Sequence, residues 1–332
     1  MPRSSPPDLS CQLAGVTLPG PLVLASGIWG TSASLLERAA RSGAGAVTAK
    51  TCTPTPRRGH RNPSAVDFGH GLINAMGLPN PGVEEEVELL REAVRRLSGY
   101  GVPLIASISA DTVEEFGRAA TAVSEAGPAL IEINISCPNV ESSGELFASS
   151  AEAAAAVTRE VKASTAIPCL VKLSPNVADI AAIAAAAAGA GADGITAVNT
   201  MPGMLIDAES GAPVLANVTG GISGPALKPI ALRCVFDIAR AVSVPIIGTG
   251  GVLTGTDAVE MISAGAWCVG VGTAIASRGD RALTLILDEL CEWMHARGIR
   301  TLAEIRGRAL RRDSPVTSNP PPIPGGGTRH AR

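Results

Sequence analysis

The sequence predicts an α/β protein built as a closed (β/α)8 TIM barrel, and three observations lead to this fold class. Eight short apolar segments recur along the 332-residue chain, each ending in small or polar residues. Helical patterns lie between them, an alternation typical of a parallel sheet that is covered on both faces. Eight such units within about 250 residues match the size of a barrel.

The predicted strands are continuous apolar runs, as expected for strands buried on both faces. They span Pro21–Gly27, Ala46–Thr51, Leu104–Ser109, Ile131–Ser136, Cys169–Ser174, Gly194–Thr200, Pro245–Gly251 and Cys268–Ala274. The helical patterns cover Ser34–Ser42, Val83–Leu97, Val113–Ala126, Ala151–Ala163, Asp179–Ala190, Pro229–Ala241 and Gly255–Ala264. An open doubly wound sheet is the alternative, but Ala25–Gly30 does not fit the G-x-G-x-x-G fingerprint that such a sheet needs after its first strand.

Three further segments complete the predicted organisation. Ser10–Pro19 looks like a small N-terminal hairpin that closes the bottom of the barrel. The connections Cys52–Gly82 and Met201–Lys228 are longer than a barrel needs, so we expect long loops at the C-terminal face that act as lids or substrate walls. We therefore expect a single barrel domain over residues 1–312 and a Pro/Gly-rich, disordered tail over residues 313–332.

Composition argues against several functional classes. The net charge is −3, so no basic field points to nucleic acid or to an anionic membrane. Met1–Ser10 lacks the apolar core of a signal peptide, and the Ala-rich run Ile180–Ala192 is too short to span a bilayer. Seven cysteines without regular spacing argue against a disulfide framework and favour the cytoplasm. Cys/His clusters with zinc spacing are missing, so we expect no metal.

Polar residues gather at the carboxyl ends of the predicted strands, which all face one mouth in a barrel. The chain holds 23 arginines but only four lysines, and Lys50 and Lys172 both end apolar strands. Arginine cannot replace a compact ammonium in a tight site, so we interpret these two as site lysines. The alternative is a strand-end lysine whose stem is buried while its ammonium reaches water. The remaining polar strand ends are Ser26, Thr51, Ser107, Asn134, Asn199 and Thr200.

These strand ends exclude some reactions and favour one cofactor. They carry no histidine and no carboxylate pair, which excludes a His/Asp triad and two-carboxylate glycoside hydrolysis. The last two strands end in Gly250–Gly251 and Gly272–Thr273, and with Gly224 these glycines predict a phosphate site, although glycine also ends many strands. Cations and amides suit a ring with several carbonyls. FMN therefore fits, with its phosphate on the glycine loops and a lysine near the ring edge that becomes negative on reduction.

Cys137 is the candidate catalytic residue, because it follows the buried strand segment Ile131–Ser136 directly. A thiol at a strand end is a candidate acid, base or nucleophile, whereas the alternative is an inert buried cysteine. Beside a flavin, this thiol could take a proton from a substrate carbon while a hydride leaves to the flavin. Cys52 is the only other plausible site thiol.

Several short motifs occur in an order that is known from one family. They are ASG at Ala25–Gly27, Lys50–Thr51, NAMGL at Asn74–Leu78, NISCPN at Asn134–Asn139, KLSPN at Lys172–Asn176, Asn199–Thr200, GGISGPALKP at Gly220–Pro229, GTGGV at Gly248–Val252 and GTA at Gly272–Ala274. With these motifs the chain resembles the dihydroorotate dehydrogenases, the flavin enzymes of pyrimidine synthesis, from its first strand to its last helix. A cysteine base is typical of the soluble members.

The resemblance implies FMN-dependent oxidation of (S)-dihydroorotate to orotate in de novo UMP biosynthesis. Cys137 would remove the proton of carbon 5, and carbon 6 would deliver a hydride to FMN. The implied substrate-binding residues are Lys50, Asn74, Ala75, Met76, Gly77, Leu78, Asn134, Asn199 and Thr200. The implied FMN-binding residues are Ser26, Lys50, Thr51, Ser107, Asn134, Lys172, Val198, Gly224, Gly250, Gly251, Gly272 and Thr273. Ser107 departs from the NAD-linked subtype, which usually has asparagine there.

The resemblance leaves the electron acceptor open. Lys172–Ile180 and Ala216–Ala231 look like the NAD-linked subtype, whose catalytic subunit works with a second subunit that carries FAD and an iron–sulfur cluster. Gly248–Asp257 and Met76–Asn80 also look like the fumarate-linked subtype. A homodimer is expected, or a heterotetramer with the second subunit. Two other functions stay open: a related flavin enzyme that acts on uracil or thymine, and a non-catalytic barrel that binds a phosphorylated ligand.

Overall fold

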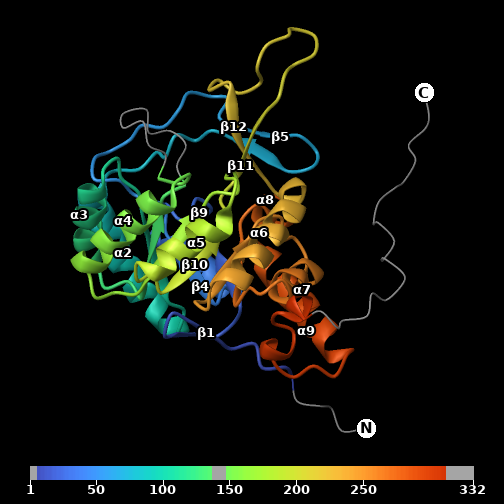
Figure 1. The fold of residues 1–332 in the computed structure, drawn as a ribbon. Helices are drawn as coiled ribbons and strands as arrows, with labels where there is room; N and C mark the ends of the chain where they lie inside the picture. Colours follow the sequence, from blue (N-terminus) through green and yellow to red (C-terminus); the bar gives the residue numbers. More distant parts are fainter. Residues whose placement is uncertain (1–5, 137–146, 312–332) are drawn as a thin grey trace.

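The computed structural model describes residues 6–136 and 147–311 and contains a closed parallel barrel (Figure 1). The strands pair in the order β10–β13–β14–β3–β4–β7–β8–β9. Each predicted apolar segment supplies one strand, so the predicted fold class is confirmed. The strands are β3 (Leu22–Leu24), β4 (Ala46–Thr48), β7 (Leu104–Ile108), β8 (Leu130–Asn134), β9 (Cys169–Leu173), β10 (Gly194–Ala197), β13 (Ile246–Thr249) and β14 (Cys268–Val271).

Helices surround the barrel, and the seven predicted ones lie where the sequence placed them to within a few residues. They are α1 (Ala33–Arg41), α2 (Val83–Leu97), α3 (Val113–Ser124), α4 (Ala151–Ser164), α5 (Ile180–Gly189), α6 (Lys228–Ala241) and α7 (Gly255–Ser263), followed by α8 (Ala274–Arg278) and α9 (Ala282–His295). Side-chain oxygens cap the first turns of α1, α3, α4, α5 and α7. Among the described helices, none has both the length and the apolar character needed to cross a membrane.

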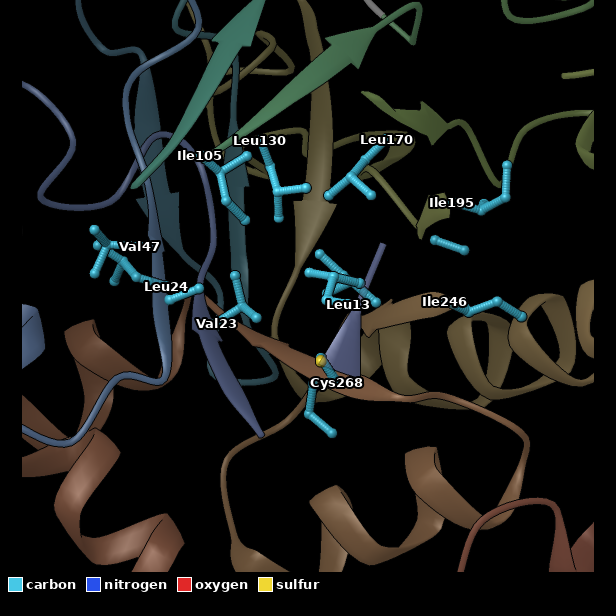
Figure 2. Packing of buried hydrophobic residues seen from close by; sticks show 14 of the residues in the cluster. Leu13, Val23, Leu24, Val47, Ile105, Leu130, Leu170, Ile195, Ile246 and Cys268 are labelled. Carbon is cyan, nitrogen blue, oxygen red and sulfur yellow. The ribbon is translucent and has the colours of Figure 1, made fainter. Parts of the chain in front are cut away.

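A hairpin of β1 (Cys11–Leu13) and β2 (Val16–Leu18) closes the amino end of the barrel, as predicted. Leu13 and Leu18 are fully buried. Figure 2 shows Leu13 among the side chains of the barrel strands, near Ile246 and Cys268. Cys11 Sγ lies 3.4 Å from Cys268 Sγ, so the hairpin contacts the last barrel strand directly.

The two long connections form an antiparallel sheet above the carboxyl end of the barrel (Figure 1). Its strands are β5 (Ala65–Asp67), β6 (Leu72–Asn74), β11 (Met201–Met204) and β12 (Thr219–Ser223), in the order β11–β12–β6–β5. The sequence predicted lids or walls here but no strands. Pairing of β6 with β12 joins the two connections, and the sheet has its own small apolar cluster of Ile73, Ala75 and Leu215.

Toward the carboxyl end, the side chains inside the barrel change from apolar to polar over two residues of each of three neighbouring strands. Ile105, Leu130 and Leu170 belong to the buried apolar core seen in Figure 2. Side chains two positions apart on a strand point to the same face. Two positions further toward the carboxyl ends of the same strands lie Ser107, Glu132 and Lys172, all of which are buried.

Candidate active site

A cavity of about 760 Å³ lies at the carboxyl end of the barrel, between the strand ends and the four-stranded sheet. Within the described residues, every predicted FMN-binding and substrate-binding residue except Ser107 lines it. The structure therefore brings together, around one cavity, predicted residues from strand ends that are far apart in the sequence. Cys137, the predicted base, lies outside the described residues, but Ser136 directly before it lines the cavity.

A chain of hydroxyl groups runs across the strand ends on one side of the cavity. Ser26 Oγ lies 3.1 Å from Thr51 Oγ1, which lies 2.8 Å from Ser107 Oγ. Ser107 donates to Glu132 Oε1 at 3.2 Å, so Thr51 is left as the donor to Ser107. Ser107 is buried beneath the cavity and does not line it. It thus supports Thr51 from below, and its predicted contact with FMN stays a prediction.

Glu132 and Lys172 form a buried ion pair, with 3.4 Å between Lys172 Nζ and Glu132 Oε1. The side chains are only 8% and 3% exposed for Lys172 and Glu132, respectively. Lys172 was predicted as a site residue from the sequence, whereas Glu132 was not. The available signal was a carboxylate inside an apolar strand, two residues before Asn134 and hence on the same face.

Ser136 orients two of the amides that line the cavity, those of Asn134 and Asn199. Its hydroxyl donates to Asn134 Oδ1 at 2.7 Å and accepts a hydrogen bond from Asn199 Nδ2. The Thr200 N–H donates to Asn199 Oδ1 at 2.8 Å, which fixes the other end of that amide. The sequence analysis did not single out Ser136, yet it couples the carboxyl ends of β8 and β10. Both amides are therefore held in place by the protein itself.

The predicted substrate segment Asn74–Leu78 continues from β6 along the cavity. Asn74 Nδ2 donates to the Gly221 carbonyl on β12 at 3.3 Å. The backbone N–H of His60 donates to the Met76 carbonyl at 3.0 Å, and His60 Nδ1 lies 3.2 Å from the Ala75 carbonyl. His60, which the sequence analysis did not predict, thus holds this segment from the side.

Glycine loops after β13 and β14 form the next part of the cavity wall. Gly250 and Gly251 have φ values of +132° and +75°, which side-chain-bearing residues rarely adopt. A Cβ on Gly251 would lie 2.5 Å from Lys228 Cβ. Lys228 itself pairs with Asp257 at 2.7 Å and with Glu260 at 2.8 Å, so this lysine supports the loop instead of facing the cavity. Thr273 Oγ1 donates to Ser223 Oγ at 2.9 Å and ties the last glycine loop to β12.

Lys50 lines the cavity, and a second buried glutamate acts on it electrostatically. Glu86 lies in the first turn of α2, is 2% exposed, and its Oε1 has no hydrogen-bond partner. Burial raises the pKa of Glu86 to about 7, and the positive charge of Lys50 opposes that rise. Each of the two site lysines thus has a buried carboxylate behind it, and both carboxylates escaped the sequence analysis.

Cys52, the alternative site thiol, does not line the cavity. It is 1% exposed, and its Sγ lies 3.6 Å from the Ser107 carbonyl. Burial raises the pKa of this thiol, and the charge of Glu86 raises it further. A thiol held in its neutral form away from the cavity cannot serve as the base, so the interpretation of Cys52 as a site thiol is wrong.

Acidic, thiol and imidazole groups do not cluster as metal ligands would. Over residues 6–136 and 147–311, no group of three or more His, Cys, Asp or Glu side chains could hold a metal ion. The polar side chains around the cavity are amides, hydroxyls and lysines. This donor set suits an organic ligand with carbonyl and anionic groups.

A closed parallel barrel with a ligand-sized cavity at its carboxyl end places this chain among the (β/α)8-barrel proteins whose site lies at the barrel mouth. The family model described as dihydroorotate dehydrogenase matches residues 8–294. The chain therefore belongs to the dihydroorotate dehydrogenase family, which confirms the resemblance seen in its motifs.

Individual relatives agree over almost their whole length. A protein of Desulforudis audaxviator is 44% identical over 300 residues, covering 90% of this chain and 96% of the relative. A protein of Geobacillus kaustophilus is 43% identical, covering 91% of this chain and 96% of the relative. A protein of Pyrococcus abyssi is 41% identical, covering 91% and 99%. Each of these relatives is named as the catalytic subunit of dihydroorotate dehydrogenase B (NAD(+)).

Proposed function

We propose that this chain oxidises dihydroorotate to orotate in pyrimidine biosynthesis, with FMN bound in the cavity at the carboxyl end. The observation that carries the proposal is the joint lining of one cavity by both site lysines, the fixed amides and the glycine loops. Family membership supports the same activity, because the relatives are named dihydroorotate dehydrogenases.

FMN has a phosphate and a polar ring, and the cavity offers glycine loops for the first and amide, hydroxyl and lysine side chains for the second. The backbone of Gly250 and Gly251, together with Thr273, would hold the phosphate, and Thr51, Asn134 and Lys172 would hold the ring. A side chain at Gly251 would meet Lys228, so the absence of a Cβ lets this loop pack closely against Lys228 and keep its place beside the cavity. When bound, FMN supplies a hydride acceptor.

The substrate would be held by groups that the protein orients in advance. Asn134 and Asn199 share the Ser136 hydroxyl, so their donors and acceptors are fixed before a substrate arrives. Asn74 is likewise held by β12. Lys50 supplies a cation that would pair with the carboxylate of dihydroorotate. Donors that are already oriented need no reorganisation during the reaction, which favours the transition state.

Cys137 is the proposed base. Its thiolate would take the proton from carbon 5 of dihydroorotate while the hydride of carbon 6 leaves, so that a carbon–carbon double bond forms between these two atoms. The proposal is supported by its place directly after Ser136, which lines the cavity beside Asn134 and Asn199. The buried position of Cys52 removes the competing thiol.

We further propose NAD as the final acceptor, reached through a partner subunit that carries FAD and an iron–sulfur cluster. The relatives are named catalytic subunits of an NAD(+) enzyme, which supports a second subunit beside this chain. We propose a heterotetramer with a homodimer of this chain at its centre. A cytoplasmic location is consistent with seven cysteines that lack the spacing of a disulfide framework.

Turnover of dihydroorotate by the FMN-loaded protein, compared with turnover of dihydrouracil, tests the proposed activity. We expect a yellow protein that is active on dihydroorotate. Activity on dihydrouracil alone would assign the chain to the uracil- and thymine-reducing enzymes, and a protein that refuses FMN would point to a non-catalytic barrel. Reoxidation by NAD with the partner subunit, but not by fumarate, is the expected result for the acceptor.

A further inference from the structure

Glu132, the buried partner of Lys172 in an ion pair, has no role in the function proposed above. We infer that Glu132 is a positioning residue that neutralises Lys172 and thereby lowers the reduction potential of the bound flavin. This inference rests on the proposed binding of FMN in the cavity. It assigns to Glu132 control over how readily the flavin accepts electrons.

Glu132 can act on a ligand only through its neighbours. Lys172 lines the cavity, whereas Glu132 does not. The Glu132 carboxylate accepts hydrogen bonds on Oε1 from Lys172 at 3.4 Å and from Ser107 at 3.2 Å. Two donors from the neighbouring strands β7 and β9 therefore hold one carboxylate oxygen in the barrel interior. This arrangement fixes both the position and the charge of the lysine above it.

Stability alone does not account for a buried ion pair at this level. Removing two charges from water costs several kcal/mol per ion, and the attraction between them often no more than offsets that cost. Two positions earlier on the same strands, Ile105, Leu130 and Leu170 belong to the apolar core. The pair lies where the apolar core meets the cavity, which is the place where a fixed charge acts most strongly on a ligand.

The direction of the effect follows from the charges. The ring gains negative charge on reduction, and a lone ammonium beside it would stabilise the reduced form. The Glu132 carboxylate offsets that ammonium, so the pair is neutral overall. Glu132→Gln leaves one positive charge, which favours reduced flavin by about tenfold or more, equal to roughly 30 mV for a two-electron couple. Lys172→Met leaves one negative charge and shifts the potential in the opposite direction.

Midpoint potentials of the FMN-loaded enzyme, measured by anaerobic dye equilibration, test this inference. We expect a higher potential in Glu132→Gln, a lower one in Lys172→Met, and a value near wild type in the double variant, where both charges are gone. Glu132→Asp keeps the charge and should stay near wild type. Asp193→Asn is the matched control, because it breaks the Lys162–Asp193 pair (2.7 Å), and Asp193 accepts from the backbone N–H of Cys169 at the other end of β9.

The outcomes separate this inference from the proposed function. An unchanged potential in Glu132→Gln, in a protein that dihydroorotate still reduces, would overturn the role of Glu132 alone. A protein that takes up no FMN would overturn both. If Glu132→Gln does not fold, the double variant decides: a potential as low as that of Lys172→Met contradicts the inference, and a return to the wild-type value supports it.

Discussion

The two ends of the barrel are built from the same strands but have opposite characters. At the amino end, Leu13 of the hairpin is fully buried among barrel side chains, and the nearest polar contact is between the thiols of Cys11 and Cys268. At the carboxyl end, Lys172 and Glu132 take up the interior directly above Leu170 and Leu130.

Two residues along a strand, toward its carboxyl end, therefore separate the side chains that stabilise the fold from the side chains that could take part in a reaction. Apolar contacts stabilise the amino end of the barrel, its floor, whereas buried charges at the mouth cost stability. Substitutions at the floor should therefore change the free energy of unfolding. Substitutions at the mouth should change flavin binding and reduction, and some of them should even raise stability.

The largest expected effect lies at the mouth. Cys137→Ser should slow flavin reduction by dihydroorotate by roughly 10²–10⁴-fold at neutral pH, because a hydroxyl is a far weaker base than a thiolate. Stopped-flow absorbance under anaerobic conditions measures this rate. Cys52→Ser is the matched control, since its thiol is buried away from the cavity and its loss should leave the rate unchanged. Equal rates in wild type and Cys137→Ser would show that another group is the base.

The second effect lies at the floor. Leu13→Ala should lower the free energy of unfolding by about 2–5 kcal/mol, because it leaves a cavity under the barrel. Urea unfolding with excess FMN measures the loss, and the dissociation constant of FMN should stay at its wild-type value. Weaker FMN binding in Leu13→Ala without a loss of stability would contradict the separate roles of the two barrel ends.

The third effect is a stability cost at the mouth that depends on pH. Burial raises the pKa of Glu86 from 4.5 to about 7, so between these values the folded protein holds a proton that the unfolded chain releases. Stability should therefore fall as pH rises from 4.5 through 7, by at most roughly 3 kcal/mol. Glu86→Gln should remove this fall in urea unfolding between pH 5 and 8. The exposed neighbour Glu85→Gln is the control, and a slope that survives in Glu86→Gln would mean that another group causes it.

The smallest effect isolates the glycine loops. Gly251→Ala should weaken FMN binding about tenfold, or about 1.4 kcal/mol, because the new Cβ would lie 2.5 Å from Lys228 Cβ and displace the loop. Gly298→Ala is the control: it has a similar φ of +66° but no atom within 4 Å of its Cβ. FMN titration by fluorescence measures both variants. Equal FMN affinity in the two variants would remove the glycine loop from the proposed phosphate site.

Much of the fold could be predicted because its signal is local. Each barrel strand is a continuous apolar run, and each predicted helix has its own pattern between two runs. The four-stranded sheet was missed because its strands, AVD, LIN, MPGM and TGGIS, are not continuous apolar runs and pair across distant connections. Helix α9 packs on α7. It was not predicted because the eight predicted strands already complete the barrel and no further strand follows this helix.

The site residues also divide into those that the sequence predicts and those that it does not. Residues at strand ends could be predicted because the topology of a barrel brings those ends together. Glu132, Ser136 and Glu86 were missed because their importance depends on partners from other elements: Lys172, Asn199 and Lys50. Ser107 was predicted to bind FMN. Its hydroxyl lies beneath the cavity and forms hydrogen bonds with Thr51 and Glu132.

Anaerobic titration of the FMN-loaded protein with dihydroorotate decides whether the cavity at the barrel mouth is the site of flavin reduction. We expect one equivalent of dihydroorotate to bleach the flavin absorbance and to yield orotate. A flavin that binds in the cavity and stays oxidised with excess dihydroorotate would contradict this expectation.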